Sequence, residues 1–388
     1  MKKLAIFLTD LGGGGAEKVM VNLANELVRR QFEVDLLLVK REGAYLSQVS
    51  SAVNLIDLKT QKLLASVPKL VRYLRRDRPD TLLTALEDTN VVAIAARLLA
   101  KGLDAVAISH YSKQAKRSIK QSPRLIVTVH NNLSQEAFSG EGIKRKLVPK
   151  LLKWIYPYAD SVVAVSEGVA ADLVNLGVRQ QQVRVIYNPI LTPDFETLAT
   201  AALAPGRSFE RAGRWLSDQS LPVLLGVGRL APQKEFQTLI RAFALANAER
   251  PLRLLILGEG SEQAALEALV RELKISDSVA FVGFVDNPLT YMSRADLCVL
   301  SSAWEGFGNV LVEAMGTGTP VVSTDCPSGP REILAGGTYG KLVPVGDVAG
   351  LAGAMLATLE HPLSSEILKR RAADFSVEAV VDEYEQIL

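Results

Sequence analysis

The feature that most constrains the fold is the alternation of short apolar runs with helix-like segments along the whole chain. Most of these runs are continuously apolar, as expected for parallel strands that helices cover on both faces. Repeated strand–helix units favour parallel sheets with right-handed crossovers. The sequence predicts strands at Leu4–Leu8, Val34–Val39, Thr81–Leu83, Ala105–Ile108, Leu125–Val129, Ser161–Val165, Val223–Val227, Leu252–Leu257, Val279–Val282, Leu297–Leu300 and Pro320–Ser323, with helices that include Ala16–Arg30 and Phe236–Ala248.

The length of the chain and one break in its rhythm predict two α/β domains. A chain of 388 residues exceeds what one doubly wound sheet ordinarily uses. The segment Asn188–Leu221 is rich in proline and lacks apolar periodicity, so we place the boundary near its start, between residues 1–190 and 191–371. An amphipathic helix follows within Ser376–Leu388. Because ligands bind at the carboxyl ends of parallel strands, we expect the site in a cleft between the two domains.

Composition and charge exclude several classes of protein. With 48% hydrophobic and 22% charged residues the chain is globular, and two cysteines and three histidines support neither a disulfide framework nor a Cys/His metal cluster. Residues 1–190 carry 28 Lys and Arg against 17 Asp and Glu, a net charge of +11, while residues 191–388 carry 16 against 25, a net charge of −9. The first half therefore faces an anionic partner. No apolar stretch approaches a membrane span, so we expect a soluble protein that at most lies on a membrane.

Two glycine turns follow predicted strands. Gly14 and Gly15 open the helix Ala16–Arg30, where glycine allows close backbone approach and the helix N-terminus attracts anions. Gly226–Ala231 fits the pattern GxGxxA, which alone would also be compatible with a dinucleotide oxidoreductase. In this turn Gly228 precedes Arg229, and Lys234 follows five residues later. Two cations beside a glycine turn suit a diphosphate, although two solvated surface charges would give the same pattern.

The segment Ser302–Met315 is the most informative block. Glu305 ends a loop after a predicted strand, and Gly306 and Gly308 permit a tight entry into a helix that begins near Asn309. Backbone N–H groups at such a helix start can meet a phosphate or a sugar hydroxyl, and we assign this role to Phe307, Gly308, Asn309 and Val310. Carboxylates such as Glu305 and Glu313 suit polyhydroxylated ligands because each accepts several hydrogen bonds.

The spacing of Glu305 and Glu313, with seven residues between them, resembles the EX7E motif of family 4 glycosyltransferases, which have the GT-B fold of two Rossmann-like domains facing across a cleft. Further stretches look like the family's other landmarks and fall in its order: Gly14–Glu17, Gly228–Leu230 followed by Lys234, Gly258–Gly260, Gly283–Phe284 and Ser328–Glu332. Glu235 departs from the family, which often has glycine after the lysine.

The resemblance implies a role for each matching residue. Arg229 and Lys234 would hold the diphosphate of a nucleotide sugar, and Glu313 would bind the ribose. Glu305 and the amides of residues 307–310 would hold the transferred sugar, and the backbone at Gly283 and Phe284 would meet the base. His130, at the end of the strand Leu125–Val129, matches the family's histidine near the reacting sugar. The terminal helix, about residues 372–388, would return to the first domain, which would bind the acceptor.

The chain has no Asp-x-Asp motif to hold a divalent metal on a sugar nucleotide. Arg229, Lys234 and helix N-termini can stabilise the leaving diphosphate instead, so we expect transfer that needs no metal or other cofactor. The family implies retention at the anomeric carbon. Because no protein nucleophile is evident, same-face attack assisted by the leaving phosphate is the preferred hypothesis.

The acceptor is less constrained than the donor. The basic stretch from Lys144 to Tyr158 either lies on an anionic membrane or covers the core with a solvated basic face. The +11 charge favours a lipid-linked or glycan acceptor over nucleic acid, in the cytoplasm or at the inner face of the cell membrane, as in enzymes of bacterial surface-polysaccharide assembly. A sugar-nucleotide epimerase and a non-catalytic nucleotide-sugar-binding protein are the rival hypotheses. UDP is favoured over GDP, and the sugar and oligomeric state are undetermined.

Overall fold

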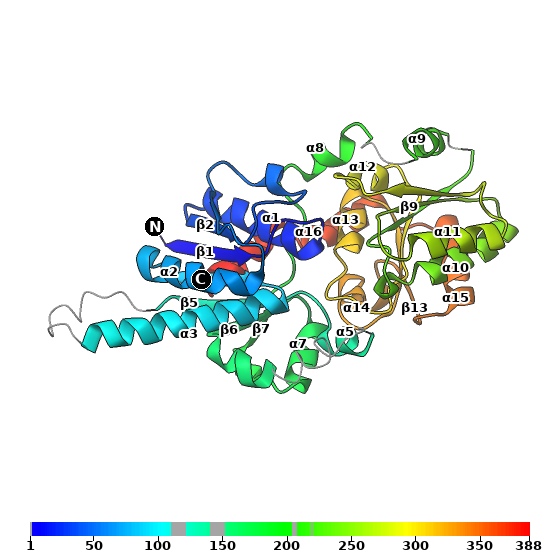
Figure 1. Cartoon of the computed structure of the whole chain (residues 1–388). Helices are drawn as coiled ribbons and strands as arrows, with labels where there is room; N and C mark the ends of the chain where they lie inside the picture. Colours follow the sequence, from blue (N-terminus) through cyan, green and yellow to red (C-terminus); the bar gives the residue numbers. More distant parts are fainter. Residues whose placement is uncertain (1, 110–121, 140–151, 204–207, 219) are drawn as a thin grey trace. The chain divides into compact units, whose positions relative to one another are not determined.

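A computed structural model describes residues 2–109, 122–139, 152–203, 208–218 and 220–388. The chain forms two compact units, each built around one parallel sheet (Figure 1). The first unit comprises Met1–Pro189 and Val377–Leu388, and the second comprises Ile190–Ser376.

The sheet of the first unit has seven parallel strands in the order β3-β2-β1-β4-β5-β6-β7. The strands are β1 (Lys3–Leu8), β2 (Glu33–Leu38), β3 (Asn54–Asp57), β4 (Thr81–Ala85), β5 (Arg124–Val129), β6 (Ser161–Ala164) and β7 (Val183–Val185). In the centre, Ile6 of β1 pairs with Leu36 of β2 and with Leu83 of β4. The edge strands β3 and β7 were not predicted, because they are short and partly exposed and so lack a continuous apolar run.

The helices of the first unit are α1 (Gly15–Arg29), α2 (Val67–Asp77), α3 (Glu87–Ser109), α5 (Leu133–Ser139), α7 (Glu167–Asn175) and α17 (Val377–Glu385), with 3-10 turns at Leu46–Gln48, Leu63–Ser66, Tyr156–Tyr158 and Gln180–Gln182. The predicted strand Ala105–Ile108 is wrong, because these residues form the end of α3. A short apolar run does not distinguish a strand from a buried helical segment, and here the helix continues through it.

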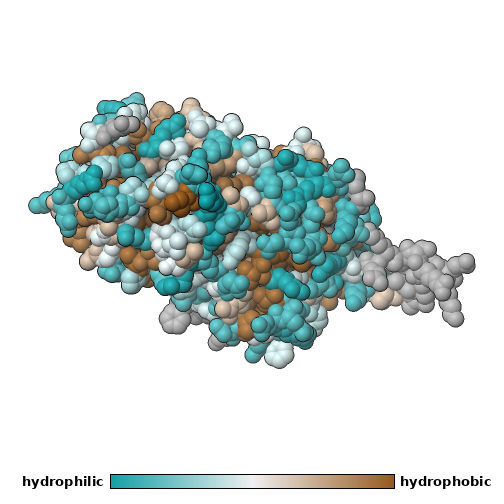
Figure 2. Space-filling view, turned by 180° about the vertical axis from the view of Figure 1, so that it is seen from behind, coloured by the Kyte–Doolittle hydropathy of each residue, from teal (hydrophilic) through white to brown (hydrophobic). Residues whose placement is uncertain are grey.

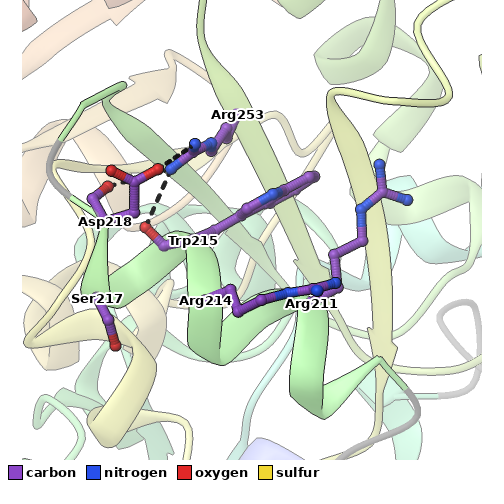
Figure 3. Close-up of a pocket in the computed structure, with 6 residues that line it drawn as sticks. All are labelled: Arg211, Arg214, Trp215, Ser217, Asp218 and Arg253. Carbon is purple, nitrogen blue, oxygen red and sulfur yellow. Dashed lines mark hydrogen bonds and ion pairs between the residues drawn. The ribbon is translucent and has the colours of Figure 1, made fainter.

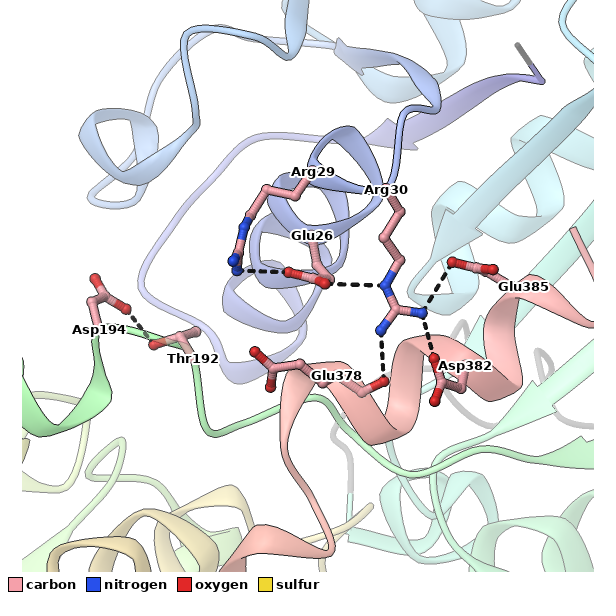
Figure 4. A network of polar contacts seen from close by, with 8 residues as sticks. All are labelled: Glu26, Arg29, Arg30, Thr192, Asp194, Glu378, Asp382 and Glu385. Atoms are coloured by element: carbon pink, nitrogen blue, oxygen red, sulfur yellow. Dashed lines mark hydrogen bonds and ion pairs between the residues drawn. The ribbon is translucent and has the colours of Figure 1, made fainter.

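The C-terminal helix α17 packs against α1 within the first unit. Its position is fixed by Arg30, which follows α1 (Figure 4). The Arg30 guanidinium donates to Glu26 of α1 at 3.0 Å, and to Asp382 at 2.5 Å and Glu385 at 3.0 Å of α17. It also donates to the carbonyl of Glu378 at 2.8 Å. A segment distant in sequence is therefore built into the first unit by charged hydrogen bonds.

The sheet of the second unit has six parallel strands in the order β10-β9-β8-β11-β12-β13. They are β8 (Val223–Val227), β9 (Arg253–Leu257), β10 (Val279–Gly283), β11 (Leu297–Leu300), β12 (Val321–Thr324) and β13 (Lys341–Val343). The helices are α8 (Phe195–Thr200), α9 (Phe209–Ser217), α10 (Phe236–Glu249), α11 (Gln263–Glu272), α12 (Leu289–Met292), α13 (Asn309–Thr317), α14 (Pro330–Ile333), α15 (Val348–Glu360) and α16 (Ser365–Ala373), with 3-10 turns η5 (Pro232–Lys234) and η6 (Ala335–Gly337).

Alternate residues of these strands face the core beneath α10, α11 and α15. Leu254 and Ile256 of β9 pack with Leu239 and Phe243 of α10 and with Met355 of α15. This period of two is the expected consequence of side chains pointing to opposite faces of a sheet. Apart from Ala105–Ile108, every predicted strand is present, with ends that agree within about two residues.

The surface seen in Figure 2 is mostly hydrophilic, with apolar residues gathered in patches between polar ones. Exposed large apolar side chains include Leu64, Leu99 and Trp154. Within the described part of the chain, no helix combines the length and apolar character that crossing a bilayer requires.

Candidate functional site

The best-defined polar contact among the predicted site residues joins Lys234 and Glu305 in the second unit. Lys234 ends η5 after β8, and Glu305 lies in the loop after β11, the strand next to β8. The Lys234 Nζ lies 2.5 Å from the Glu305 Oε1, and the Ser302 Oγ donates to that same oxygen at 2.6 Å. The side chains of Lys234 and Glu305 are only 19% and 8% exposed. A cation and a carboxylate are therefore paired, mostly buried, at the carboxyl ends of two neighbouring strands.

Further hydrogen bonds hold these two loops together. The Ala303 N–H donates to the Gln233 carbonyl at 2.8 Å, and the Gln233 side-chain amide donates to the Trp304 carbonyl at 3.0 Å. The Ser301 hydroxyl donates to the Lys234 carbonyl at 2.8 Å. Because the backbone on both sides is fixed, Lys234 and Glu305 are held in place by more than their own contact.

The predicted glycine landmarks pack against one another at this edge of the sheet. Gly258 has a φ of +128°, and a Cβ there would lie 1.9 Å from the Gly228 carbonyl oxygen. The Gly258 N–H also donates to the Gly283 carbonyl at 2.8 Å. Only glycine permits this approach of two backbones. The turns after β8, β9 and β10 thus form one continuous backbone surface beside Lys234.

The helix α13 begins directly after the Glu305 loop. Gly308 has a φ of +101° and forms the N-cap, so the chain turns sharply into Asn309–Thr317. Phe307 is buried, and its ring packs edge-on against Phe375 at 5.3 Å. The backbone of Phe307 is approached by Gly329, where a Cβ would lie 1.8 Å from the Phe307 carbonyl oxygen. This fixed helix start places the positive end of a helix dipole next to Glu305.

The remaining predicted residues of the second unit lie in the turns after β8 and β10 and in the first turns of α13. Glu313 lies in α13 and is 6% exposed. Its charge acts on the thiol of Cys298 in β11: burial of this thiol, and then the charge of Glu313, raise the pKa of Cys298 to about 12. Arg229 is exposed, and among the described residues its side chain makes no hydrogen bond or ion pair. Phe284 is 42% exposed directly after β10. Val310 is half-buried in the first turn of α13.

In the first unit, His130 follows β5, as predicted. Its Nε2 lies 2.9 Å from the Thr128 Oγ1, and its Nδ1 is buried without a hydrogen-bond partner. Burial lowers the pKa of His130 to about 4. The imidazole is therefore neutral at pH 7, with one ring nitrogen as donor and the other as acceptor.

Gly14 is the N-cap of α1 and Gly15 is its first residue, as the sequence predicted for this turn. A side chain at position 14 would meet the Glu17 carboxylate at 2.3 Å, so this carboxylate lies over the start of its own helix. The Gly12 N–H donates to Asp10 at 2.9 Å. Two acidic side chains thus lie at the glycine loop, and contact of Gly14 and Gly15 with an anionic ligand stays a prediction.

Comparison with known proteins decides the family. Residues 13–192 match the model of "Glycosyltransferase Family 4", and residues 221–361 match that of "Glycosyl transferases group 1". The chain is 30% identical, over 96% of its length and 94% of the relative's, to the N-acetylgalactosamine-N,N'-diacetylbacillosaminyl-diphospho-undecaprenol 4-alpha-N-acetylgalactosaminyltransferase of Campylobacter jejuni. The chain is a family 4 glycosyltransferase. This confirms the family that the motifs indicated.

Other relatives and solved structures agree with this assignment. The glycosyltransferase is 30% identical to the lipopolysaccharide 1,6-galactosyltransferase of Escherichia coli, over 50% of each chain. Its structure superimposes on Anabaena HepE in complex with UDP and glucose with a TM-score of 0.77, covering 100% of this chain and 99% of that chain at 21% identity. Together with the two parallel sheets, this likeness confirms the predicted GT-B fold.

Two residues of the glycosyltransferase that the sequence analysis missed are Glu87 and Asn90, at the start of α3 directly after β4. Buried oxygens of both side chains have no hydrogen-bond partner. The preceding Leu86 has a φ of +74°, a left-handed conformation that is costly for leucine. The available signal was an acidic pair, Glu87 and Asp88, that begins four residues after the predicted strand Thr81–Leu83. Acids at helix starts are common, however, because they interact favourably with the helix dipole.

A pocket of about 530 Å³ lies on the second unit, away from the ion pair (Figure 3). It is lined by Arg211, Arg214, Trp215, Ser217, Asp218 and Arg253. Arg253 is the first residue of β9, so the pocket lies at the amino ends of the parallel strands. The Arg253 guanidinium donates to Asp218 at 2.6 Å and lies over the Trp215 ring. This opposite edge is not where α/β sheets ordinarily bind nucleotides.

Two further predictions concern metals and membranes. Across the described ranges, no three His, Cys, Asp or Glu side chains gather in a group that could hold a metal ion.

The basic stretch from Lys144 lies largely outside the described residues, which resume at 152. There Trp154 is 68% exposed, with the Lys153 ammonium 5.5 Å from its ring centroid. Contact with a membrane stays a prediction.

Proposed function

We propose that this glycosyltransferase moves a sugar from a nucleotide diphosphate sugar, UDP-sugar by preference, to a lipid-linked or glycan acceptor in cell-surface polysaccharide or glycoconjugate biosynthesis. The second unit binds the donor and the first unit binds the acceptor. The observation that carries the proposal is the Lys234–Glu305 pair at the carboxyl ends of β8 and β11, beside the glycine turns that allow close approach of a ligand.

Lys234 and Arg229 bind the diphosphate in this proposal. The Lys234 ammonium has three protons, and one of them is directed at Glu305, which leaves two donors for phosphate oxygens. Arg229 is exposed and presents a planar fork of donors. Together with the start of α13, these fixed positive groups stabilise the charge that develops on the leaving diphosphate, so the proposed reaction needs no metal.

The carboxylates bind the polyhydroxylated parts of the donor. Glu305 has a second oxygen besides the one that Lys234 and Ser302 contact, and this oxygen accepts from a hydroxyl of the transferred sugar. The amides of Phe307, Gly308, Asn309 and Val310 assist there. Glu313 accepts from the ribose, and the backbone at Gly283 with the exposed Phe284 meets the base.

We propose that transfer retains the anomeric configuration by same-face attack. The Glu305 carboxylate pairs with Lys234 and accepts a hydrogen bond from Ser302, and both contacts lower its nucleophilicity. An acceptor hydroxyl then forms the new bond to the anomeric carbon as the bond to the phosphate oxygen breaks. The hydroxyl proton passes to that leaving phosphate oxygen. His130, neutral at pH 7, hydrogen-bonds the reacting sugar without adding charge.

The acceptor class is supported by the relatives and by charge. The Campylobacter jejuni relative is named for a lipid-linked acceptor, and the Escherichia coli relative for lipopolysaccharide. The first 190 residues carry a charge of +11, which suits an anionic lipid surface or an anionic glycan. We therefore propose a site of action in the cytoplasm, next to the inner face of the cell membrane.

Thermal-shift screening against UDP- and GDP-sugars, in the presence of EDTA, tests the donor side. A ligand that binds the native state raises the melting temperature, so at least one UDP-sugar is expected to do so. Incubation with that donor alone should yield no epimerised nucleotide sugar. Transfer to an acceptor lipid extract, followed by NMR of the anomeric proton, tests retention. An absolute requirement for added metal, or an inverted product, would contradict the mechanism.

A further inference from the structure

Two unpartnered polar atoms mark a second polar site in the first unit, at the carboxyl ends of β4 and β5. They are the Oε1 of Glu87 and the Oδ1 of Asn90, and both are buried without a hydrogen-bond partner. Glu87 and Asn90 are three residues apart in α3, so they share one side of its first turn. A buried acceptor that lacks a donor costs free energy, and a bound ligand that donates hydrogen bonds would remove this cost.

The Asn90 side chain is fixed so that its oxygen is left to accept. Asn90 is 0% exposed, and its Nδ2 donates to the Thr128 carbonyl at 2.9 Å and to the Tyr156 hydroxyl at 3.2 Å. Both protons of the amide are therefore used within the protein. Tyr156 is itself 0% exposed, so this arrangement is rigid. A group that pairs with the free Oδ1 must be a hydrogen-bond donor.

The charges near Glu87 disfavour an anionic ligand. Glu136 of α5 and Asp88 of its own helix act electrostatically on Glu87, and Glu87 acts on the Tyr156 hydroxyl. Glu136 is positioned by Asn131, whose side-chain amide donates to it at 3.0 Å. In the described part of the chain the groups that act on Glu87 are acids and a phenol, and no cation there pairs with it. A phosphate would meet repulsion here, whereas a sugar hydroxyl would find acceptors.

We propose that Glu87 and Asn90 bind hydroxyl groups of a neutral sugar at the end of the acceptor, so that the enzyme extends a sugar-terminated acceptor and does not transfer to a bare lipid phosphate. This inference rests on the proposed function and narrows its acceptor class. The +11 charge of residues 1–190 then serves other parts of the acceptor or the membrane, and the strand ends receive the uncharged sugar.

The test compares acceptors and variants in one transfer assay at pH 8. The acceptors are octyl glycosides of glucose, galactose, N-acetylglucosamine and N-acetylgalactosamine, with undecaprenyl phosphate as the bare lipid phosphate. The variants are Glu87→Gln and Asn90→Ala, with Lys101→Ala, which removes an exposed charge of the same helix, as control. UDP binding by calorimetry is measured on every protein.

We expect transfer to at least one glycoside and none to undecaprenyl phosphate. Glu87→Gln and Asn90→Ala should each raise the acceptor KM about tenfold or more, as expected for loss of a hydrogen bond to a charged or fixed acceptor. UDP binding in both variants, and the acceptor KM in Lys101→Ala, should stay at the wild-type value. Transfer to undecaprenyl phosphate, no transfer to any glycoside by a protein that binds UDP, or an unchanged acceptor KM in Glu87→Gln would each overturn the inference. If Asn90→Ala does not fold, Glu87→Gln alone decides. Loss of UDP binding by the wild type would instead count against the proposed function.

Discussion

The Nζ of Lys234 lies 2.5 Å from the Oε1 of Glu305, although the two residues are 71 positions apart in the sequence. The contact joins the turn after β8 to the loop after β11, and both side chains are mostly buried. In the proposed mechanism one residue binds the diphosphate and the other binds the sugar. The pair would therefore hold the diphosphate and the sugar of the donor at a fixed separation, on either side of the sugar–phosphate bond that breaks.

Replacing Lys234 with alanine should lower kcat/KM by about two orders of magnitude, or about 3 kcal/mol, as when one fixed donor to a developing anion is lost. Steady-state kinetics with the donor found by screening measure this change. Lys341→Ala removes an exposed lysine at the start of β13 and should leave kcat/KM unchanged. Wild-type activity in Lys234→Ala would show that Lys234 does not stabilise the leaving diphosphate.

The same substitution should also lower stability, because Glu305 then stays buried without its cation. Loss of one partner of a buried pair typically costs about 3 kcal/mol. The double variant Lys234→Met with Glu305→Gln removes both charges and should regain much of the unfolding free energy while activity stays low. Chemical denaturation of the two variants separates folding from catalysis. Recovery of activity together with stability would show that Lys234 acts only in folding.

Glu235 provides a test of backbone strain next to the site. It adopts a left-handed conformation with a φ of +48° at the N-cap of α10, a conformation that favours glycine. Glu235→Gly relieves this strain, which offsets the greater flexibility of the unfolded chain, so we expect a change within about 0.5 kcal/mol. Glu267→Gly, within α11, should cost about 1 kcal/mol. An equal loss in both variants, measured by denaturation, would contradict the strain at Glu235.

Arg30 should be a main support for the docking of α17. Its guanidinium is 21% exposed and serves Glu26, Asp382, Glu385 and the Glu378 carbonyl. Asp382 and Glu385 are well exposed, so solvent screens their attraction to Arg30. We therefore expect Arg30→Ala to lower the unfolding free energy by about 2 kcal/mol, which is less than the loss of four buried hydrogen bonds would cost. Arg29→Ala, which removes a 60% exposed arginine with one partner, should cost under about 1 kcal/mol. Hydrogen exchange in α17 should rise only in Arg30→Ala.

Two partly buried groups, Glu87 and His130, should give opposite dependences of stability on pH. Burial and then the charge of Glu136 raise the pKa of Glu87 from 4.5 to about 7, so its contribution to stability is full below pH 4.5 and is lost as the pH rises to 7. Burial lowers the pKa of His130 from 6.5 to about 4, so its contribution is full above pH 6.5 and is lost as the pH falls to 4. Between pH 4.5 and 6.5 the two effects oppose each other.

Single variants should reveal each effect. Relative to wild type, Glu87→Gln should gain stability as the pH rises from 4.5 to 7, by up to about 3 kcal/mol at pH 8. His130→Gln should gain relative stability as the pH falls from 6.5 to 4. Denaturation curves across pH 4 to 8 measure both differences. A difference that does not vary with pH would mean that the group keeps its ordinary pKa in the folded protein.

The sequence was sufficient for the central strands because they are covered on both faces and so are continuously apolar. The same rule failed at Ala105–Ile108, where α3 continues through an apolar run, and at the edge strands β3, β7 and β13, which are short and partly exposed. Pattern alone does not contain the tertiary contacts that decide such cases.

Some residues of the candidate site could be predicted from the sequence and others could not. Lys234 and Glu305 were predicted from their positions after strands, and the parallel order of β8 and β11 brings them together. Glu87 and Asn90 were missed because their significance lies in buried oxygens without partners, which depends on Thr128 and Tyr156 from other elements. A sequence records the acid and the amide but not which hydrogen bonds remain unmade.

Calorimetric titration with UDP in the presence of EDTA tests the central claim most directly, that a nucleotide diphosphate binds at the carboxyl ends of the strands in the second unit without metal. We predict binding to the wild type and about tenfold or greater loss of affinity in Arg229→Ala, as for loss of a charge-assisted hydrogen bond to phosphate. Arg214→Ala, in the pocket at the opposite edge, should bind as the wild type does. Full affinity for UDP in Arg229→Ala, with loss of affinity in Arg214→Ala, would place the nucleotide at the amino ends of the strands and contradict the account.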